Sequence, residues 1–493
     1  MLVEEKVDLS SIEKHLTRTH AVLTALDESA FTGFHWKAMI TSGMGFFTDA
    51  YDLFIIGVAL SVLTPLWHLN SLEVGLLGST SLLAAAFGAL LFGRLADAIG
   101  RHAIYGLTLV VLAIGAIASA FSPNVFWLIA FRFILGLGIG GDYPLSATLM
   151  SEYANRRDRG KMVTMVFSMQ ALGLIFGPLV ALLLLGSGIN HDLVWRIMLA
   201  LGAVPALATF YLRRQIDETP RYALTMRGDH DGASRTINAV TGKAQRNTRK
   251  TAQASVKNTS QKPARRRKSW LSLLLKPPYI RWLMGTAGCW FLLDIAYYGT
   301  TISSPLVLKA LNSHASLTTN TLYTLLIFVI AALPGYILAV FTIDRLGRKL
   351  IQCLGFALMT LAYSLIAFAP ALSTLTLPFL LVYGVSYFFT EFGPNVTTFV
   401  YPAEVFPVMI RTTGHGIAAA LGKCGAFLGA FIFPYLLSTF HLSGAMGFAA
   451  IVSFLGLLLT ALLLPEPNQR SLEEISNEHA VLSAGAEPVP VDA

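Results

Sequence analysis

Residues 72–101 read LEVGLLGSTSLLAAAFGALLFGRLADAIGR. No charged residue lies between Glu73 and Arg94, and an apolar run of this length can cross a bilayer as one helix. Charged residues return together at its end, in the segment DAIGR at residues 97–101. A second apolar run is followed by the similar segment DRLGR at residues 344–348. The sequence therefore predicts membrane-spanning helices that belong to two related sets.

The overall composition agrees with this interpretation. Hydrophobic residues make up 54% of the chain and charged residues 13%, whereas a soluble domain has about 25% charged residues. Apolar runs of spanning length recur at residues 38–63, 72–96, 102–121, 125–150, 161–186, 195–213, 279–308, 319–343, 350–370, 374–402, 412–438 and 445–465. We predict an all-α membrane protein with twelve transmembrane helices in two six-helix halves.

These spans divide the chain into five parts. We expect an N-terminal segment without a cleavable signal (1–37), a first six-helix half (38–213), a basic loop (214–278), a second six-helix half (279–465) and a disordered polar tail (466–493).

The distribution of positive charge predicts the orientation. The net charge of +8 is concentrated in the loop at 214–278, which includes the run Arg265-Arg266-Arg267-Lys268, whereas the short loops near 122–124, 187–192 and 371–374 have no Lys or Arg. Basic loops remain in the cytoplasm, so we expect both termini and the long loop there. We attribute the positive charge of the loop to this rule and expect the loop to contact anionic membrane lipids. We predict no nucleic-acid partner.

Acidic and basic residues at the helix ends repeat between the halves. Glu152 and Arg159 are followed by the equally spaced pair Glu404 and Arg411. Such residues could simply cap helices and obey the charge rule. The alternative is a gate of cytoplasmic salt bridges that holds one access state closed. The residues predicted for this gate are Asp97, Arg101, Glu152, Arg159, Asp344, Arg348, Glu404 and Arg411.

Polar residues inside the predicted spans are the candidate site, because charges there are costly. They are Asp49, Asp52, Asp142, Tyr143, Gln170, Trp290, Asp294, Tyr298, Glu391, Asn395 and Lys423. Trp290, Asp294 and Tyr298 share a helix face at spacings of four residues. Gln170 and Asn395 could instead be interhelical hydrogen-bond partners, and the aromatic residues could be ordinary packing.

Lys423 is the clearest basic residue among the spans, and several carboxylates face this one cation. Some carboxylates must therefore be protonated or solvated, as a proton relay requires. Lys423 together with Tyr, Trp and amide donors suits a small oxyanion. A nearby Asp can exchange a proton with that anion, which would couple binding to protonation.

Several longer motifs resemble the phosphate:proton symporter family of the major facilitator superfamily. They are GFFTDAYDLF at 45–54, GGDYPLS at 140–146, MSEYAN at 150–155, WFLLDIA at 290–296, GPN at 393–395 and PAE at 402–404. The resemblance implies the major facilitator fold and proton-coupled import of inorganic phosphate by alternating access.

The resemblance also assigns roles to residues. It implies that phosphate is bound by Tyr143, Gln170, Trp290, Asp294, Tyr298 and Asn395, and Lys423 matches a nearby family lysine. It implies that Asp49 and Asp142 take part in proton movement, with Asp52 as an addition. From the face shared by Trp290, Asp294 and Tyr298 we predict that Asp294 contacts the anion and changes protonation during transport.

Glu391 departs from the family pattern, in which we expect Asn. It lies one helical turn before Asn395, so both can face the same cavity. We predict that Glu391 is mostly protonated when substrate is bound and makes uptake favour acidic medium. The alternative is that it faces water on the cavity wall and matters little. The segment Gly299-Thr300-Thr301 is also less polar than in plant and fungal members.

Other functions remain as alternatives at this point. The same fold could carry another small anion, such as an organic acid or sulfate, or the protein could be a nutrient sensor that binds phosphate. We do not expect an enzyme, a cofactor or a metal site, because the sequence has no metal-ligand cluster or nucleophile elbow. The expected location is the plasma membrane, or the inner membrane if the protein is bacterial.

Overall fold

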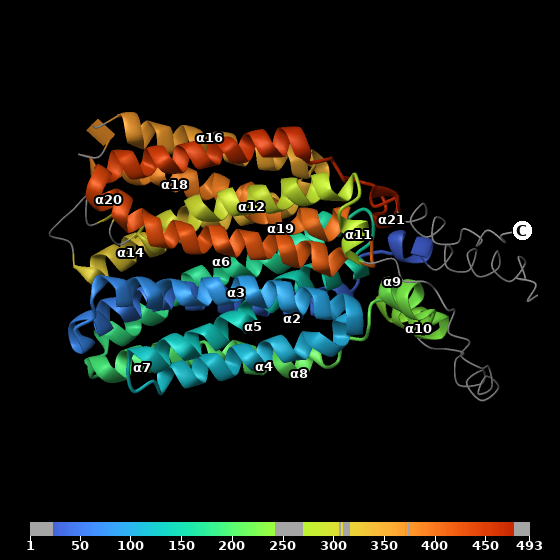
Figure 1. Cartoon of the computed structure of the whole chain (residues 1–493), viewed down its shortest axis with the longest axis horizontal. Coiled ribbons are helices and arrows are strands. Elements are labelled where there is room, and N and C mark those ends of the chain that lie inside the picture. Colours follow the sequence, from blue (N-terminus) through green and yellow to red (C-terminus); the bar gives the residue numbers. More distant parts are fainter. Residues whose placement is uncertain are drawn as a thin grey trace, which may run out of the picture.

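The computed structural model describes residues 23–241, 270–304, 307–308, 316–369, 371–372 and 375–477, and these residues contain helices but no strands. Figure 1 shows two bundles side by side, one coloured blue to green and the other yellow to red. The first half consists of α2 (Gly33–Trp67), α3 (Ser71–Ile99), α4 (Arg101–Ala120), α5 (Val125–Tyr153), α6 (Arg159–Gly186), α7 (His191–Leu201) and α8 (Ala203–Arg213).

The second half repeats this order. It consists of α12 (Tyr279–Ile302), α14 (Leu317–Ile327), the π-helix η2 (Phe328–Ala332), α15 (Leu333–Leu346), α16 (Arg348–Phe368), α18 (Thr376–Phe392), α19 (Pro394–Val405) and α20 (Arg411–Leu463). In the described residues, nine helices are long and apolar enough to cross a membrane. One of them, α20, contains two spans joined at His441, where a backbone φ of 56° breaks the helix. With α12 and the α18–α19 pair, these helices account for the twelve predicted spans.

The internal packing of the two halves is also repeated. Helix α2 packs on α6, and α12 packs on α20. Gly173 on α6 and Gly425 on α20 make each contact close, since an added Cβ would collide with the carbonyl oxygen of Phe47 or Phe291. Small residues allow membrane helices to approach in this way. The halves then meet where α3 contacts α20 and where α6 contacts α14 and α15.

Helix breaks direct polar side chains toward the contact between the halves. The tenth span breaks at Gly393, and Pro394 begins the next helix without an amide hydrogen to donate. Glu391 and Asn395 lie on the two sides of this break. The π-helix η2 interrupts the eighth span just before Tyr336, and such interruptions are frequent at functional sites.

Short helices gather at one end of the bundle. They are α9 (Pro220–Tyr222), the π-helix η1 (Ala223–Arg227), α10 (His230–Val240), α11 (Trp270–Leu274) and α21 (Leu472–Ile475). We call this end the terminal face, because both ends of the described chain lie there (Figure 1), and the other end the opposite face.

Two segments predicted to be irregular are folded on the terminal face. The start of the basic loop forms α9, η1 and α10, and the Tyr153 hydroxyl donates to the Asp217 carbonyl. Residues 466–477 differ from the expected disordered tail, because Leu472 and Ile475 are buried. The basic run at 265–268 and residues 478–493 lie outside the described residues.

Arg221 connects three of these terminal-face segments. Its guanidinium is buried and donates to Glu473 at 2.8 Å, to Asp27 at 2.5 Å and to the Glu152 carbonyl at 2.7 Å. Burial alone would raise the pKa of Glu473, but the charge and hydrogen bond of Arg221 outweigh it and lower that pKa to about 2. The tail is therefore attached to the first half by an ion pair.

We predict that Glu473→Gln loosens α21. Amide hydrogen exchange of residues 472–475 should be faster in the variant than in wild type near neutral pH. Because the pKa of Glu473 is lower in the folded protein, its ionised form stabilises the fold at pH values above its ordinary pKa of 4.5. This stabilisation is lost as the pH falls toward about 2. The difference between the two proteins should therefore disappear over that range. Glu474→Gln, at an exposed neighbour, is the matched control; an equal effect there would contradict the prediction.

Candidate functional site

Buried ion pairs connect the halves at the terminal face. Arg101 lies 3.1 Å from Asp97 and 3.2 Å from Glu152, and Arg411 of the second half lies 3.0 Å from Glu152. Asp97 also accepts two hydrogen bonds from Thr413, each 2.6 Å long. All four charged side chains of this group are fully buried.

The repeated motif forms a second group of the same kind. Arg348 lies 2.9 Å from Asp344 and 2.8 Å from Glu404, and Arg159 of the first half lies 3.2 Å from Glu404. Asp344 accepts hydrogen bonds from the backbone amides of Gly160 and Lys161, across the contact between the halves. The eight residues predicted for a gate therefore form two matching groups, which we call the terminal gate. It is closed in this structure.

A cluster around Lys423 lies between the halves. Lys423 Nζ donates to the hydroxyls of Tyr298 and, at 3.0 Å, Tyr143, and the Tyr143 hydroxyl donates to Asp49 at 2.5 Å. Lys423 Nζ lies 4.0 Å from Asp294 Oδ2, which accepts no hydrogen bond from the residues that the structure describes. We call these five residues the central cluster. Its two carboxylates share one cation, and none of its side chains is more than 6% exposed.

Trp290 extends this cluster toward the terminal gate. Its ring lies 5.9 Å from that of Tyr143 and contacts Gly422, where an added Cβ would collide with the indole. Because residue 422 is glycine, the indole of Trp290 can pack against the backbone beside Lys423.

Gln170 and Asn395 belong to a neighbouring amide cluster. Asn395 Nδ2 lies within hydrogen-bond distance of Gln170 Oε1, the Tyr336 hydroxyl and Glu391 Oε2. The Tyr336 hydroxyl donates to Gln170 Oε1 at 2.7 Å. Gln170 is on α6 of the first half and the other three residues are on the second half, so this cluster also joins the halves. Glu391 is fully buried in this conformation, unlike the alternative in which it faces water.

Two of the predicted proton-coupling carboxylates have arginine partners. Arg132 lies 2.5 Å from Asp52 and donates to Ser81. Arg213 binds Asp142 through both terminal nitrogens, and both arginines are fully buried. Our sequence analysis identified Lys423 as the clearest basic residue and missed these two. Arg132 lies within an apolar run, which could have indicated it, whereas Arg213 lies at the edge of one. Tyr336 carried no signal in the sequence.

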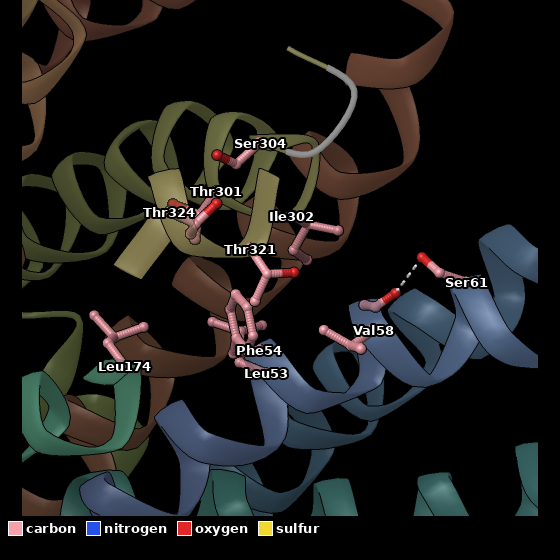
Figure 2. A pocket seen from close by; sticks show the side chains of 11 residues that line it. Leu53, Phe54, Val58, Ser61, Leu174, Thr301, Ile302, Ser304, Thr321 and Thr324 are labelled. Carbon is pink, nitrogen blue, oxygen red and sulfur yellow. Dashed lines mark hydrogen bonds between the residues drawn. The ribbon is translucent and has the colours of Figure 1, made fainter. Parts of the chain in front are cut away.

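A small cavity lies toward the opposite face. Its volume is about 30 Å³, and it lies between α2, α12 and α14 (Figure 2). Leu53, Phe54 and Val58 line it on one side and Thr301, Ser304, Thr321 and Thr324 on the other. This volume holds a water molecule or two. The residues of the central cluster are at most 6% exposed in this conformation.

Comparison with known proteins fits this architecture of two gated halves. The model of the sugar (and other) transporter family matches residues 37–479. The chain belongs to this family. Two relatives are the probable inorganic phosphate transporter 1-6 of Arabidopsis thaliana and the low affinity inorganic phosphate transporter 1 of Petunia hybrida. Each relative is 37% identical to this transporter in an alignment that covers 93% of the transporter's chain. The alignment covers 96% of the Arabidopsis protein and 95% of the Petunia protein.

A solved structure supports the fold of this transporter. The major facilitator superfamily proton:xylose symporter XylE, bound to 6-bromo-6-deoxy-D-glucose, superposes with a TM-score of 0.75 and 19% identity, covering 91% of this chain and 100% of XylE. Identity this low bears on the fold alone. The prediction of a twelve-span major facilitator transporter, related to phosphate transporters, is confirmed.

We predict that Glu404→Gln opens the terminal gate. The change leaves Arg159 and Arg348 buried beside a neutral side chain, and breaking a buried pair costs about 3–5 kcal/mol. Ser151, whose hydroxyl donates to the Ala403 carbonyl across the gate, is buried in the closed state. In a background without the three native cysteines, Ser151→Cys should react severalfold faster with a thiol reagent when Glu404→Gln is present.

The control removes a carboxylate from an exposed ion pair. Asp192 pairs with Arg196 and is 47% exposed, so Asp192→Asn should leave the labelling of residue 151 unchanged. Equal labelling in the Glu404 variant and the control would contradict the gate.

Proposed function

We propose that this protein is a proton-coupled symporter that imports inorganic phosphate by alternating access. The central cluster carries the proposal, because it places one buried cation between two carboxylates at the contact between the halves. The relatives named as inorganic phosphate transporters support phosphate as the substrate.

The charge of the central cluster explains the coupling. Lys423 can neutralise only one of Asp49 and Asp294, and a second ionised carboxylate without a cation is costly when buried. An arriving phosphate becomes the new counter-ion of Lys423. A carboxylate that it replaces then takes up a proton, so phosphate and a proton enter the occluded state together.

Neutral donors complete the proposed phosphate site. Tyr143 and Tyr298 already contact Lys423, and the indole of Trp290 lies beside them. Gln170 and Asn395 offer amide groups from the two sides of the halves' contact. Hydrogen bonds from such donors to a charged oxygen are strong and short. Phosphate would thereby link the halves in place of the present direct bonds.

Asp52 and Asp142 have a different part in this proposal. Each is paired with a buried arginine here, so neither needs a proton in the closed conformation. We infer that they accept protons only in a conformation that separates them from Arg132 and Arg213. Asp49 and Asp294 are then the first proton carriers.

The orientation follows from the charge of the terminal face. The described ends of the long loop and the gate arginines lie on that face (Figure 1), and positively charged loops remain in the cytoplasm. We therefore place the terminal face in the cytoplasm, with anionic lipids beside the basic loop. The protein would reside in the plasma membrane, or in the inner membrane of a bacterium, with phosphate entering from the opposite face.

Proteoliposomes test the proposal directly. Labelled phosphate should accumulate in vesicles with purified protein when an inward proton gradient is imposed, and excess sulfate or organic acids should not compete. Asp294→Asn keeps the shape but cannot exchange a proton, so gradient-driven accumulation should be abolished. Accumulation at the wild-type level by this variant would show that Asp294 is not a proton carrier, and the absence of phosphate transport by wild type would refute the function.

The second variant concerns the cation. Lys423→Met removes the positive charge that attracts the anion, so uptake should fall by at least about tenfold. A tenfold fall corresponds to the loss of roughly 1.4 kcal/mol of binding free energy. Protein level and melting temperature should remain near those of wild type. If Lys423 only balances Asp294, the double variant Lys423→Met, Asp294→Asn would regain uptake, and this result would contradict its role in binding.

A further inference from the structure

Glu391 is a buried carboxylate outside the central cluster. It lies on α18 in the interior of the second half and has no exposed surface. In the described part of the chain, no Lys, Arg or His lies within 4.0 Å of its oxygen atoms. The groups that face it are neutral. They are Tyr297 of α12, Tyr336 of α15, Tyr363 of α16, Asn395 of α19 and, through Asn395, Gln170 of α6.

Two buried polar atoms lie beside each other at this place. They are Glu391 Oε1 and the Tyr297 hydroxyl, which interact with each other, and within the described residues neither atom has a partner at full hydrogen-bond geometry. A buried carboxylate with neither a cation nor a full set of donors is most stable as the neutral acid. The Tyr297 hydroxyl can donate to an ionised Oε1 or accept from a protonated one, so this contact serves Glu391 in both states, and the lack of a nearby cation is what favours the neutral acid.

A row of hydroxyl groups leads from Glu391 toward the opposite face. Tyr383, Tyr387 and Glu391 lie at spacings of four residues on one face of α18. The Tyr387 hydroxyl donates to Thr301 at 3.1 Å, and Thr301 lies one helical turn after Tyr297 on α12. Thr301 lines the cavity at the opposite face (Figure 2), next to Ser304. Thr301, Tyr387 and Tyr297 thus form what we call the hydroxyl row.

Asn395 links the state of Glu391 to the amide cluster. Its amide nitrogen has two hydrogens, yet three oxygen atoms lie within hydrogen-bond distance. An ionised Glu391 is the strongest of these acceptors and competes with an anion for the amide hydrogens. Protonation removes that competition and makes Asn395 available to a substrate.

We propose that Glu391 is a second proton-binding site, filled from the opposite face through the hydroxyl row. A proton adds to Oε1 of the carboxylate and is released to water when the terminal gate opens. This inference rests on the proposed phosphate symport and adds one proton to each cycle. Monobasic phosphate with one proton at the central cluster carries no net charge across the membrane, whereas a second proton makes the cycle move one positive charge.

Membrane potential distinguishes the two stoichiometries. In proteoliposomes with a potassium diffusion potential, wild type should accumulate phosphate more strongly as the interior becomes negative. One charge across about 100 mV corresponds to a roughly 50-fold change in the accumulation ratio. Glu391→Gln imitates the protonated acid, so it should still transport phosphate with a proton gradient but should lose the response to potential.

Removing single hydroxyls tests the proton path. Tyr387→Phe should keep the response to potential but slow uptake severalfold, and the loss should grow as external pH rises and protons become scarce. Tyr401→Phe is the matched control, because Tyr401 is also buried and its hydroxyl forms no hydrogen bond with any described residue. It should leave the rate and its dependence on pH unchanged.

The outcomes separate this inference from the proposed function. Phosphate symport by wild type together with an unchanged potential response in Glu391→Gln would refute the second proton site alone. Uptake driven by a sodium gradient at constant pH, and lost in Glu391→Gln, would make the site one for sodium and would also refute the inference. Failure of wild type to move phosphate at all would instead refute the proposed function.

Discussion

The pairing of buried charges organises this structure. A charge inside a membrane bundle is costly unless a counter-charge and hydrogen bonds compensate it. Two of the gate arginines meet this condition across the halves, Arg411 with Glu152 and Arg159 with Glu404. Each of these two pairs takes one partner from each half. The charges are therefore neutralised only when the two halves are in contact at the terminal face. The helices can separate there only when these pairs are broken or hydrated.

The interior contains the places where this compensation is incomplete. Lys423 has two carboxylates nearby, and Asp294 Oδ2 has no hydrogen-bond donor in the described part of the chain. Glu391 has no cation at all among the described residues near it. A proton or an anion can complete the balance at each place, which is why these positions are suited to binding and the gate is suited to closure. We therefore propose these incompletely paired positions as the binding sites.

The two halves have the same helix arrangement and the same gate residues, but their interior polar residues differ. The gate repeats faithfully, with Asp97, Arg101 and Glu152 matched by Asp344, Arg348 and Glu404. The interior does not repeat. In the first half Asp52 and Asp142 have arginines, whereas the second half holds Lys423, Asp294 and Glu391 with fewer opposite charges. In the transport that we propose, the repeated gate would let the halves move against each other, and the unequal interior would bind the substrate.

Much of this protein could be predicted from its sequence. The spans, the repeat, the gate residues and Lys423 were all predictable, because charged residues stand out in apolar runs and membrane insertion restricts them to a few roles. The pairing of Asp52 with Arg132 and of Asp142 with Arg213 required the tertiary structure. So did the place of Tyr336 and the attachment of the tail through Arg221 and Glu473. Each joins segments far apart in the chain, and only the packing of the helices decides which long side chains can reach each other.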